Sequence, residues 1–182
     1  MLKKTDAAKI PVELIGSSPV RPDGVPKVTG MAQYGADYAL PGMLWGKVLR
    51  SPHAHARIVS IDASRAQALP GVKAVMTAAD MPDQDFTYQG PERVQVNFWH
   101  MTRNVMAREK VLFAGHPVAA VAATTEAIAR EALGLIAVKY EVLPHVIDVD
   151  QAMQDDAPLL FEDMITRGNE QAKPSNVSRV KT

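Results

Sequence analysis

Cysteine is absent from the 182 residues of this chain. Without thiols the chain cannot form a disulfide, supply a thiolate nucleophile, or hold an iron–sulfur cluster or Cys-ligated zinc by itself. An excess of charge of either sign is also absent, because 20 Lys and Arg side chains balance 20 Asp and Glu side chains. No net charge therefore attracts the chain to nucleic acid or to an anionic membrane.

Long apolar runs are missing as well. No stretch approaches the roughly 20 apolar residues that a membrane-spanning helix needs, so we expect no membrane segment. In residues 1–16 the apolar side chains are interrupted by Asp6, Pro11 and Glu13, which is unlike a signal peptide. We therefore expect a cytoplasmic protein.

Length and hydrophobic content set the domain organisation. A chain of 182 residues, 47% of them hydrophobic, suffices for one well-packed domain and is too short for two large ones. Residues 1–20 lack periodicity and are predicted to form an N-terminal arm. Residues 21–165 are predicted to form the folded domain. Residues 166–182, whose only large apolar side chains are two valines, are predicted to be a polar tail or linker.

The stretch from Gly42 to Asp62 carries the most information. Large apolar side chains occupy both alternating faces from Met43 to Leu49, which predicts a strand covered on both sides. After Pro52 the pattern becomes extended with one polar face. Asp62 then has the position of a helix N-cap.

Two strand–helix–strand units are predicted in tandem. The first runs through the helix after Asp62 to a strand at residues 72–76. The second runs from a strand at 118–122, through a helix capped by Thr124 or Thr125, to a strand at 136–142. Asp150 is the predicted cap of a last helical turn. Residues 83–110 are predicted to be a long polar loop that faces a partner.

Several motifs follow one another in a recognisable order. They read VTGMAQYGAD, LPGMLWG, RSPHAHARIVSID, ALPGVKAVMTAAD, EKVLFAGHPVAAVAA and VKYEVLP. In this order, over about residues 14–162, the chain resembles the N-terminal domain of the molybdenum-binding subunit of the xanthine dehydrogenase, aldehyde oxidase and carbon monoxide dehydrogenase family. That domain is the a/b hammerhead. The resemblance implies an α+β fold, a mixed β-sheet with helices packed on it.

The same resemblance implies a component of a molybdenum hydroxylase. In such enzymes a molybdopterin cofactor hydroxylates an aldehyde or an N-heterocycle with oxygen from water, and electrons leave through iron–sulfur centres to a flavin or another acceptor. The family's pterin-binding segments and catalytic glutamate lie downstream of this domain. We therefore assign no catalytic, cofactor-binding or metal residue to this chain. Its expected partners are a molybdopterin-binding chain or domain and the iron–sulfur and flavin subunits. The alternative is a stand-alone hammerhead module that binds a small molecule or a protein.

His53 and His55 form the most metal-like pattern. On a strand, residues two apart place their side chains on one face about 7 Å apart, close enough to chelate a metal. A catalytic site needs at least a third protein ligand, and His100, His116 and His145 show no matching spacing. A framework role is the favoured reading of the pair.

Several other polar residues could belong to a binding or catalytic site or could have a purely structural role. Arg50 and Arg57 have the geometry to hold a phosphate, but arginines of this kind more often pair with carboxylates. A Ser51, His53 and Asp62 triad lacks a nucleophile elbow. Residues 115–117, Gly-His-Pro, are too short for a phosphate loop. Acidic pairs at 83/85, 148/150 and 155/156 lack the glycine-centred spacing of a calcium loop.

Phe98 and Trp99 stand out in an otherwise polar stretch, with Met101 and Met106 nearby. Aromatic side chains and methionines are concentrated at the cores of protein interfaces. These residues form either a contact surface for a partner or a local cap over the domain's own core. The sequence favours neither reading.

Overall fold

The computed structural model describes residues 16–83, 86–90, 95–164 and 174–177. No helix within these ranges is long and apolar enough to cross a membrane. The chain divides into two units, residues 1–41 and 42–182. The first contains helix α1 (Gly24–Val28) and the short helix η1 (Gly35–Asp37), whose Asp37 carboxylate accepts a hydrogen bond from the Tyr34 backbone N–H.

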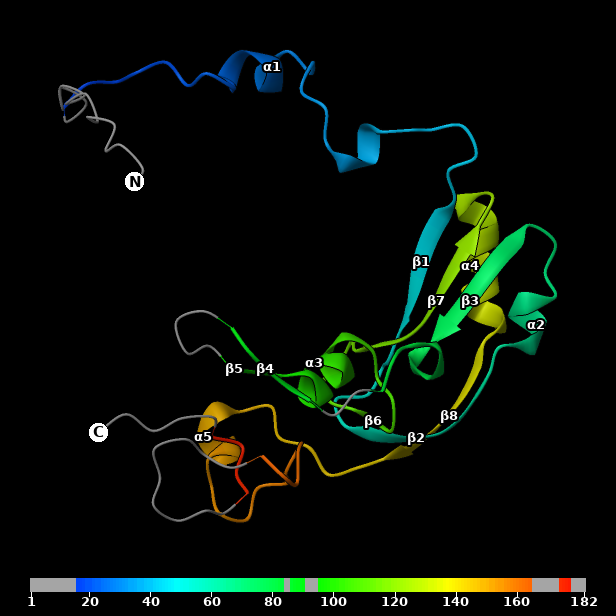
Figure 1. The fold of residues 1–182 in the computed structure, drawn as a ribbon, viewed down its shortest axis with the longest axis vertical. Coiled ribbons are helices and arrows are strands. Elements are labelled where there is room, and N and C mark those ends of the chain that lie inside the picture. Colours follow the sequence, from blue (N-terminus) through cyan, green and yellow to red (C-terminus); the bar gives the residue numbers. More distant parts are fainter. Residues whose placement is uncertain (1–15, 84–85, 91–94, 165–173, 178–182) are drawn as a thin grey trace, which may run out of the picture. The chain divides into compact units, whose positions relative to one another are not determined.

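Two three-stranded sheets and one hairpin form the second unit (Figure 1). In each sheet the strands pair antiparallel. The first sheet has the order β1 (Trp45–Arg50), β7 (Pro117–Ala123), β3 (Val72–Thr77). The second has the order β6 (Lys110–Val111), β2 (Ala56–Asp62), β8 (Ala137–Val142). The hairpin pairs β4 (Thr87–Gln89) with β5 (Gln95–Asn97).

The two predicted strand–helix–strand units are present, and each contributes one strand to each of the two sheets. The chain leaves β2 in the second sheet, passes through α2 (Ser64–Gln67) and enters β3 in the first sheet. It later leaves β7, passes through α4 (Glu126–Leu135) and enters β8 in the second sheet. Because β2 pairs with β8 and β3 pairs with β7, the two connections run side by side in opposite directions, with α2 against α4 (Figure 1).

Small side chains allow this close packing. The main core contains Ala66 of α2, Ala119 and Val121 of β7, and Ala132 of α4, with Ile136 at the end of that helix. Alanine on both surfaces lets a helix approach a sheet closely, and partly buried leucines such as Leu133 and Leu135 pack around this contact.

The inner face of α4 differs from the one that its helical spacing predicts. The spacing predicts an inner face of Ala127, Ile128, Glu131 and Leu135. Ile128 and Leu135 are half-buried, but Ala127 and Glu131 are exposed. Ala129 and Ala132 are the buried residues of the helix. The buried centre of the inner face therefore consists of alanines, and Leu133 and Leu135 pack beside it, partly buried against the core.

A second core lies where the two sheets meet. It contains Ala56 of β2, Ala107, Val111 of β6 and Val118 of β7, with Tyr140 packed against it. Alternate residues of β7 therefore serve different cores, since Ala119 and Val121 face α4 whereas Val118 faces the second core.

Of the predicted capping residues, Thr125 is the N-cap of α4, whereas Asp62 lies one residue before Ala63, the N-cap of α2. Asp62 accepts a hydrogen bond from the Ser64 N–H at 2.9 Å, and Thr125 accepts one from the Ile128 N–H at 3.2 Å. The last helix, α5 (Val149–Ala152), has Asp148 as its N-cap, and the Asp148 carboxylate accepts a hydrogen bond from the Gln151 N–H at 3.0 Å. The prediction of Asp150 as its cap is wrong, because the preceding residue with extended backbone is Asp148.

The prediction of a long loop over residues 83–110 is also wrong. This stretch holds the β4–β5 hairpin and the eight-residue helix α3 (Phe98–Val105). Asn97 caps α3 by accepting a hydrogen bond from the His100 N–H at 3.3 Å. The sequence does not predict this helix, because the residue that it buries is the charged Arg103 and it has no stripe of buried apolar residues.

Candidate functional site

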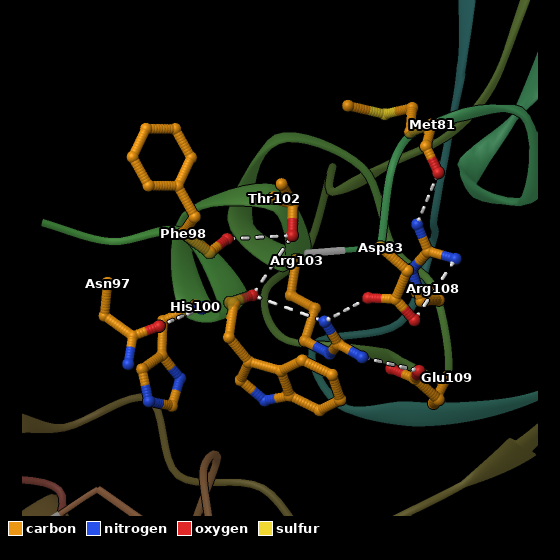
Figure 2. A network of polar contacts seen from close by, with 10 residues as sticks. Met81, Asp83, Asn97, Phe98, His100, Thr102, Arg103, Arg108 and Glu109 are labelled. Atoms are coloured by element: carbon orange, nitrogen blue, oxygen red, sulfur yellow. Dashed lines mark hydrogen bonds and ion pairs between the residues drawn. The ribbon is translucent and has the colours of Figure 1, made fainter. Parts of the chain in front are cut away.

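Arg103 is the centre of a polar network (Figure 2). Its side chain is 8% exposed, and its guanidinium forms ion pairs with Asp83 at 3.1 Å and Glu109 at 3.0 Å. The guanidinium also stacks over the Trp99 ring, 3.1 Å from the ring centroid. A planar guanidinium can make all three contacts at once, whereas an ammonium cannot.

Position on α3 explains the stacking. Trp99 and Arg103 are four residues apart and therefore lie on the same side of the helix. Arg103 also donates to the Trp99 carbonyl at 3.4 Å. Next to it, Arg108 donates to the Met81 carbonyl at 3.0 Å (Figure 2). The network thus joins three separate segments: the turn after η2 (Ala78–Asp80), the helix α3, and the residues before β6.

A pocket of about 470 Å³ lies beside this network. Its cationic lining residues already have acidic partners. Arg57 pairs with Glu141 at 3.1 Å across β2 and β8, Lys110 with Glu162 at 3.4 Å, and Arg103 with its two carboxylates. Glu109, Glu162 and Asp163 add three acidic side chains to the wall. The wall therefore has no surplus of positive charge to attract a phosphate-bearing group.

His53 and His55 do not act together. Both precede β2, and they contact different groups. The ring of His53 packs edge-on against Tyr140, with centroids 5.0 Å apart. His55 is 5% exposed and its Nδ1 donates to the Pro144 carbonyl at 2.8 Å. These contacts support the framework reading of the pair.

His116 is fully buried. Its Nδ1 accepts a hydrogen bond from the Leu112 N–H at 3.1 Å, and its ring stacks on Phe113 with centroids 4.4 Å apart. Burial lowers the pKa of His116 below its usual value, although the nearby backbone of Arg103 and Asn104 acts in the opposite direction. His116 is therefore a neutral structural residue that shapes the turn between β6 and β7. No local pattern in the Gly-His-Pro segment indicates such a role.

Ser51, His53 and Asp62, the residues of the triad considered from the sequence, bind different partners. The Ser51 hydroxyl accepts from the His53 N–H at 3.0 Å. Asp62 lies at the opposite end of β2, next to the start of α2, and its hydrogen bonds to Ser64 lower its pKa. No Ser–His–Asp geometry results among these three residues.

The two arginines of the phosphate hypothesis have structural contacts. Arg50 donates to the Gly115 carbonyl at 2.9 Å, and Arg57 pairs with Glu141, its cross-strand neighbour in the register. Carboxylate pairing, the favoured prediction, therefore holds for Arg57, whereas Arg50 binds a backbone oxygen.

The acidic residues within the described ranges do not gather around a cation site. No group of three or more His, Asp or Glu side chains in these ranges could hold a metal ion. Asp83 pairs with Arg103, Asp148 caps α5, and Asp155 and Asp156 are exposed. Asp85 lies outside the described residues.

The aromatic segment of α3 has two parts. Met106 is 5% exposed and Trp99 supports Arg103, so these two residues cap the domain itself. Phe98 stacks on Phe86 with centroids 4.4 Å apart, and Met101 is 40% exposed. The cap reading is therefore confirmed for Met106 and Trp99, and a partner contact at Phe98 and Met101 stays a prediction.

Comparison with known proteins gives a consistent result. The family described as "Aldehyde oxidase and xanthine dehydrogenase, a/b hammerhead domain" matches residues 29–144. The chain is 47% identical over 135 residues to the carbon monoxide dehydrogenase large chain of Afipia carboxidovorans, across 74% of this chain and 16% of that protein. It is 42% identical over 147 residues to a probable xanthine dehydrogenase subunit of Bacillus subtilis, across 80% of this chain and 18% of that protein.

Solved structures give the same result. The fold is similar to a Cu,Mo-CO dehydrogenase, with a TM-score of 0.64 and 42% identity over 82% of this chain and 18% of that chain. It is also similar to quinoline 2-oxidoreductase from Pseudomonas putida 86, with a TM-score of 0.64 and 40% identity over 78% of this chain and 18% of that chain. The chain spans less than a fifth of the length of these relatives.

Proposed function

Because this chain belongs to the aldehyde oxidase and xanthine dehydrogenase family, whose a/b hammerhead domain it contains, we propose that it is the hammerhead component of a molybdenum hydroxylase. The observation that carries the proposal is the continuous match over residues 29–144 together with 47% identity to a carbon monoxide dehydrogenase large chain. The α+β fold, with α4 packed on an antiparallel sheet, agrees with that family.

We propose that the component is noncatalytic by itself. Its buried polar side chains make framework contacts: His55 with the Pro144 carbonyl, His116 with the Leu112 N–H, and Arg103 with two carboxylates. The pocket beside Arg103 does not fit a molybdopterin, because it carries as many acidic as basic side chains and its cations are already paired. The cofactor would be held by another part of the enzyme.

If another part of the enzyme holds the cofactor, that part is the first proposed partner of this chain. Relatives include the nicotinate dehydrogenase large molybdopterin subunit of Eubacterium barkeri, at 34% identity, and the xanthine dehydrogenase molybdenum-binding subunit of Escherichia coli O157:H7, at 34%. By analogy, this domain packs against a molybdopterin-binding portion, and iron–sulfur and flavin subunits complete the enzyme. The cofactor supplies the hydroxylation chemistry. The hammerhead supplies a rigid support beside it.

Purification of the native assembly tests the proposal. An affinity tag on this chain should recover a complex whose intact mass exceeds that of the chain and whose metal analysis shows molybdenum in fixed proportion to protein. The isolated 182-residue chain should bind no molybdenum and show no dehydrogenase activity. Turnover by the isolated chain, or a native protein without molybdenum, would contradict the proposal.

A stand-alone binding module is the second candidate, and the pocket of about 470 Å³ beside Trp99 favours it. This role predicts that a small molecule copurifies with the isolated chain and that Trp99 fluorescence responds to it. Native mass spectrometry of the isolated chain distinguishes the two roles, because the hammerhead component is expected to carry no bound ligand.

We propose that residues 1–20 act as an arm and residues 166–182 as a linker around the domain at 21–165. Most of the two terminal segments lies outside the described residues. Limited proteolysis should cleave these segments first and leave the domain intact. A cytoplasmic location is also proposed, and cell fractionation of the tagged protein tests it.

A further inference from the structure

The sheet β1–β7–β3 has two faces, and α4 covers one of them (Figure 1). Side chains of paired residues in an antiparallel sheet project to the same side, so the register identifies the residues of the opposite face. Val48 and Met76 both pair with Ala120, and Gly46 and Ala74 both pair with Ala122. We call this surface the open face; it consists of Gly46, Val48, Ala74, Met76, Ala120 and Ala122.

The open face is apolar and accessible. Val48 is 39% exposed and Met76 is 40% exposed. Gly46 and Ala74 are exposed, and Ala120 and Ala122 are half-buried. None of the six residues is charged or polar, whereas the solvent side of an antiparallel sheet ordinarily carries polar residues. The next residue on this side of β7, Val118, is buried in the second core, which closes one end of the face.

The sequence independently indicates a covered surface. The strand β7 reads PVAAVAA and has no polar side chain on either face. The segment from Met43 to Leu49 likewise has apolar side chains on both faces, which is typical of strands buried on two sides. Within the described part of residues 42–164, α4 covers one face and leaves Val48 exposed, so these sheets and helices do not supply the predicted cover of the second face. The missing cover must come from outside the two sheets and their helices.

We propose that the open face is the docking surface for the molybdopterin-binding portion of the enzyme, which places an apolar segment against it. This inference rests on the proposed function. In the two carbon monoxide dehydrogenase relatives, the region that matches this chain is less than a fifth of one chain. The remaining part of such a chain, more than four fifths of it, can supply a segment that packs against the open face. Ala120 lies between Val48 and Met76, and the next row across the sheet is Gly46, Ala122 and Ala74. These small residues let an apolar segment approach the sheet backbone closely.

Methionine oxidation tests the proposal because the chain contains a matched pair. Met76 on the open face and Met101 on α3 are both 40% exposed. The native complex, captured through this chain, is treated with hydrogen peroxide beside the isolated 182-residue chain, and sulfoxide at each methionine is measured by peptide mass spectrometry. We expect similar oxidation rates of the two residues in the isolated chain. In the complex we expect Met76 to be oxidised at least about fivefold more slowly, with a smaller change at Met101.

Three results would overturn the docking surface. The first is a complex in which Met76 remains as reactive as in the isolated chain. The second is protection of Met101 without protection of Met76. The third is protection of Met76 in the isolated chain that rises with its concentration, because a second copy would then occupy the face. Failure to recover any complex removes the proposed function itself, so the two failures are distinguishable.

A pair of charge insertions provides an independent test. Val48→Lys places an ammonium on the open face, and Val59→Lys places one at an exposed position of β2, where Val59 is 51% exposed. Both variants should fold, as judged by circular dichroism, because both side chains reach solvent. The yield of complex captured through the chain should fall at least about tenfold for V48K and little for V59K. Equal yields for the two variants would contradict the proposed surface.

Discussion

Gly71 and Ile128 are in direct contact where the two strand–helix–strand connections meet. A β-carbon added to Gly71 would lie 2.7 Å from Cδ1 of Ile128 and 2.9 Å from Oγ1 of Thr124. Gly71 also has a φ of +95° and its carbonyl accepts a hydrogen bond from the Thr124 N–H at 2.9 Å. The turn after α2 is thus fixed against the first turn of α4 by a residue without a side chain.

The contact predicts that Gly71→Ala lowers the free energy of unfolding by about 2 to 3 kcal/mol, since alanine is strained at positive φ and its methyl group clashes with α4. Urea unfolding of the full chain measures the loss. Gly115→Ala is the matched control, because Gly115 has a φ of +85° and nothing within 4 Å of the added carbon. It should cost about 1 kcal/mol. Equal losses for the two variants would show that the contact with Ile128 does not constrain Gly71.

Replacement of Arg103 should loosen the three segments that its guanidinium joins. Arg103→Ala should lower the free energy of unfolding by about 2 kcal/mol. This is less than the full cost of breaking a buried pair, because Asp83 and Glu109 are 44% and 56% exposed and water can solvate them. Arg103→Lys should recover little of the loss, since it keeps the charge but not the planar stacking group. Chemical unfolding followed by Trp fluorescence provides the measurement.

The exposed pair between Arg130 and Glu126 is the control for Arg103. Arg130 is 75% exposed and is held by Glu126 at 3.0 Å. Arg130→Ala should leave the unfolding midpoint nearly unchanged, because solvent-exposed ion pairs contribute little. A comparable loss for both arginines would contradict the structural role assigned to Arg103.

His116 should make the stability depend on pH. Burial lowers its pKa in the folded state, so between its ordinary value near 6.5 and the lower folded value the unfolded chain binds more protons than the folded one. The free energy of unfolding should therefore fall as the pH decreases from about 7.5 to about 5.5. His116→Asn keeps an acceptor near the position of Nδ1 and removes the titration, so its unfolding free energy should change less over this range.

Exposed His145 provides the control for that pH series. His145→Asn should leave the slope of stability against pH unchanged, because its ring is not buried among packed residues. If His116→Asn and the original chain show the same slope, burial of His116 is not the source of the acid sensitivity.

Removal of the α4 cap should destabilise the helix that covers the sheet β1–β7–β3. Thr125→Ala deletes the side-chain oxygen that accepts from the Ile128 N–H at 3.2 Å. The free energy of unfolding should decrease by about 1 kcal/mol. Thr125→Ser keeps the hydroxyl and should retain most of the stability in thermal unfolding followed by circular dichroism. Equal losses for alanine and serine would point to the lost methyl group instead of the cap.

Local patterns were sufficient for much of the fold. Runs of apolar residues located β3 and β7, alternating apolar residues located β8, and the N-cap Thr125 located the start of α4, because the signals for these elements lie within a few neighbouring residues. The helix α3 was missed for the same reason. Its burial depends on Asp83 and Glu109, which lie outside the helix and complete the partners of Arg103.

The sequence by itself determined the family motifs, most strands and the capping residues, since these depend on side-chain periodicity and on hydrogen bonds between near neighbours. The tertiary structure decided what each polar residue does. His53 contacts Tyr140, whereas His55 binds the Pro144 carbonyl. Likewise, Arg50 binds the Gly115 carbonyl, whereas Arg57 pairs with Glu141. These partners come from distant segments that the sheet pairings bring beside β1 and β2. The pairing register also decided which apolar residues of β1 and β7 face α4 and which remain exposed, and no local pattern contains that register.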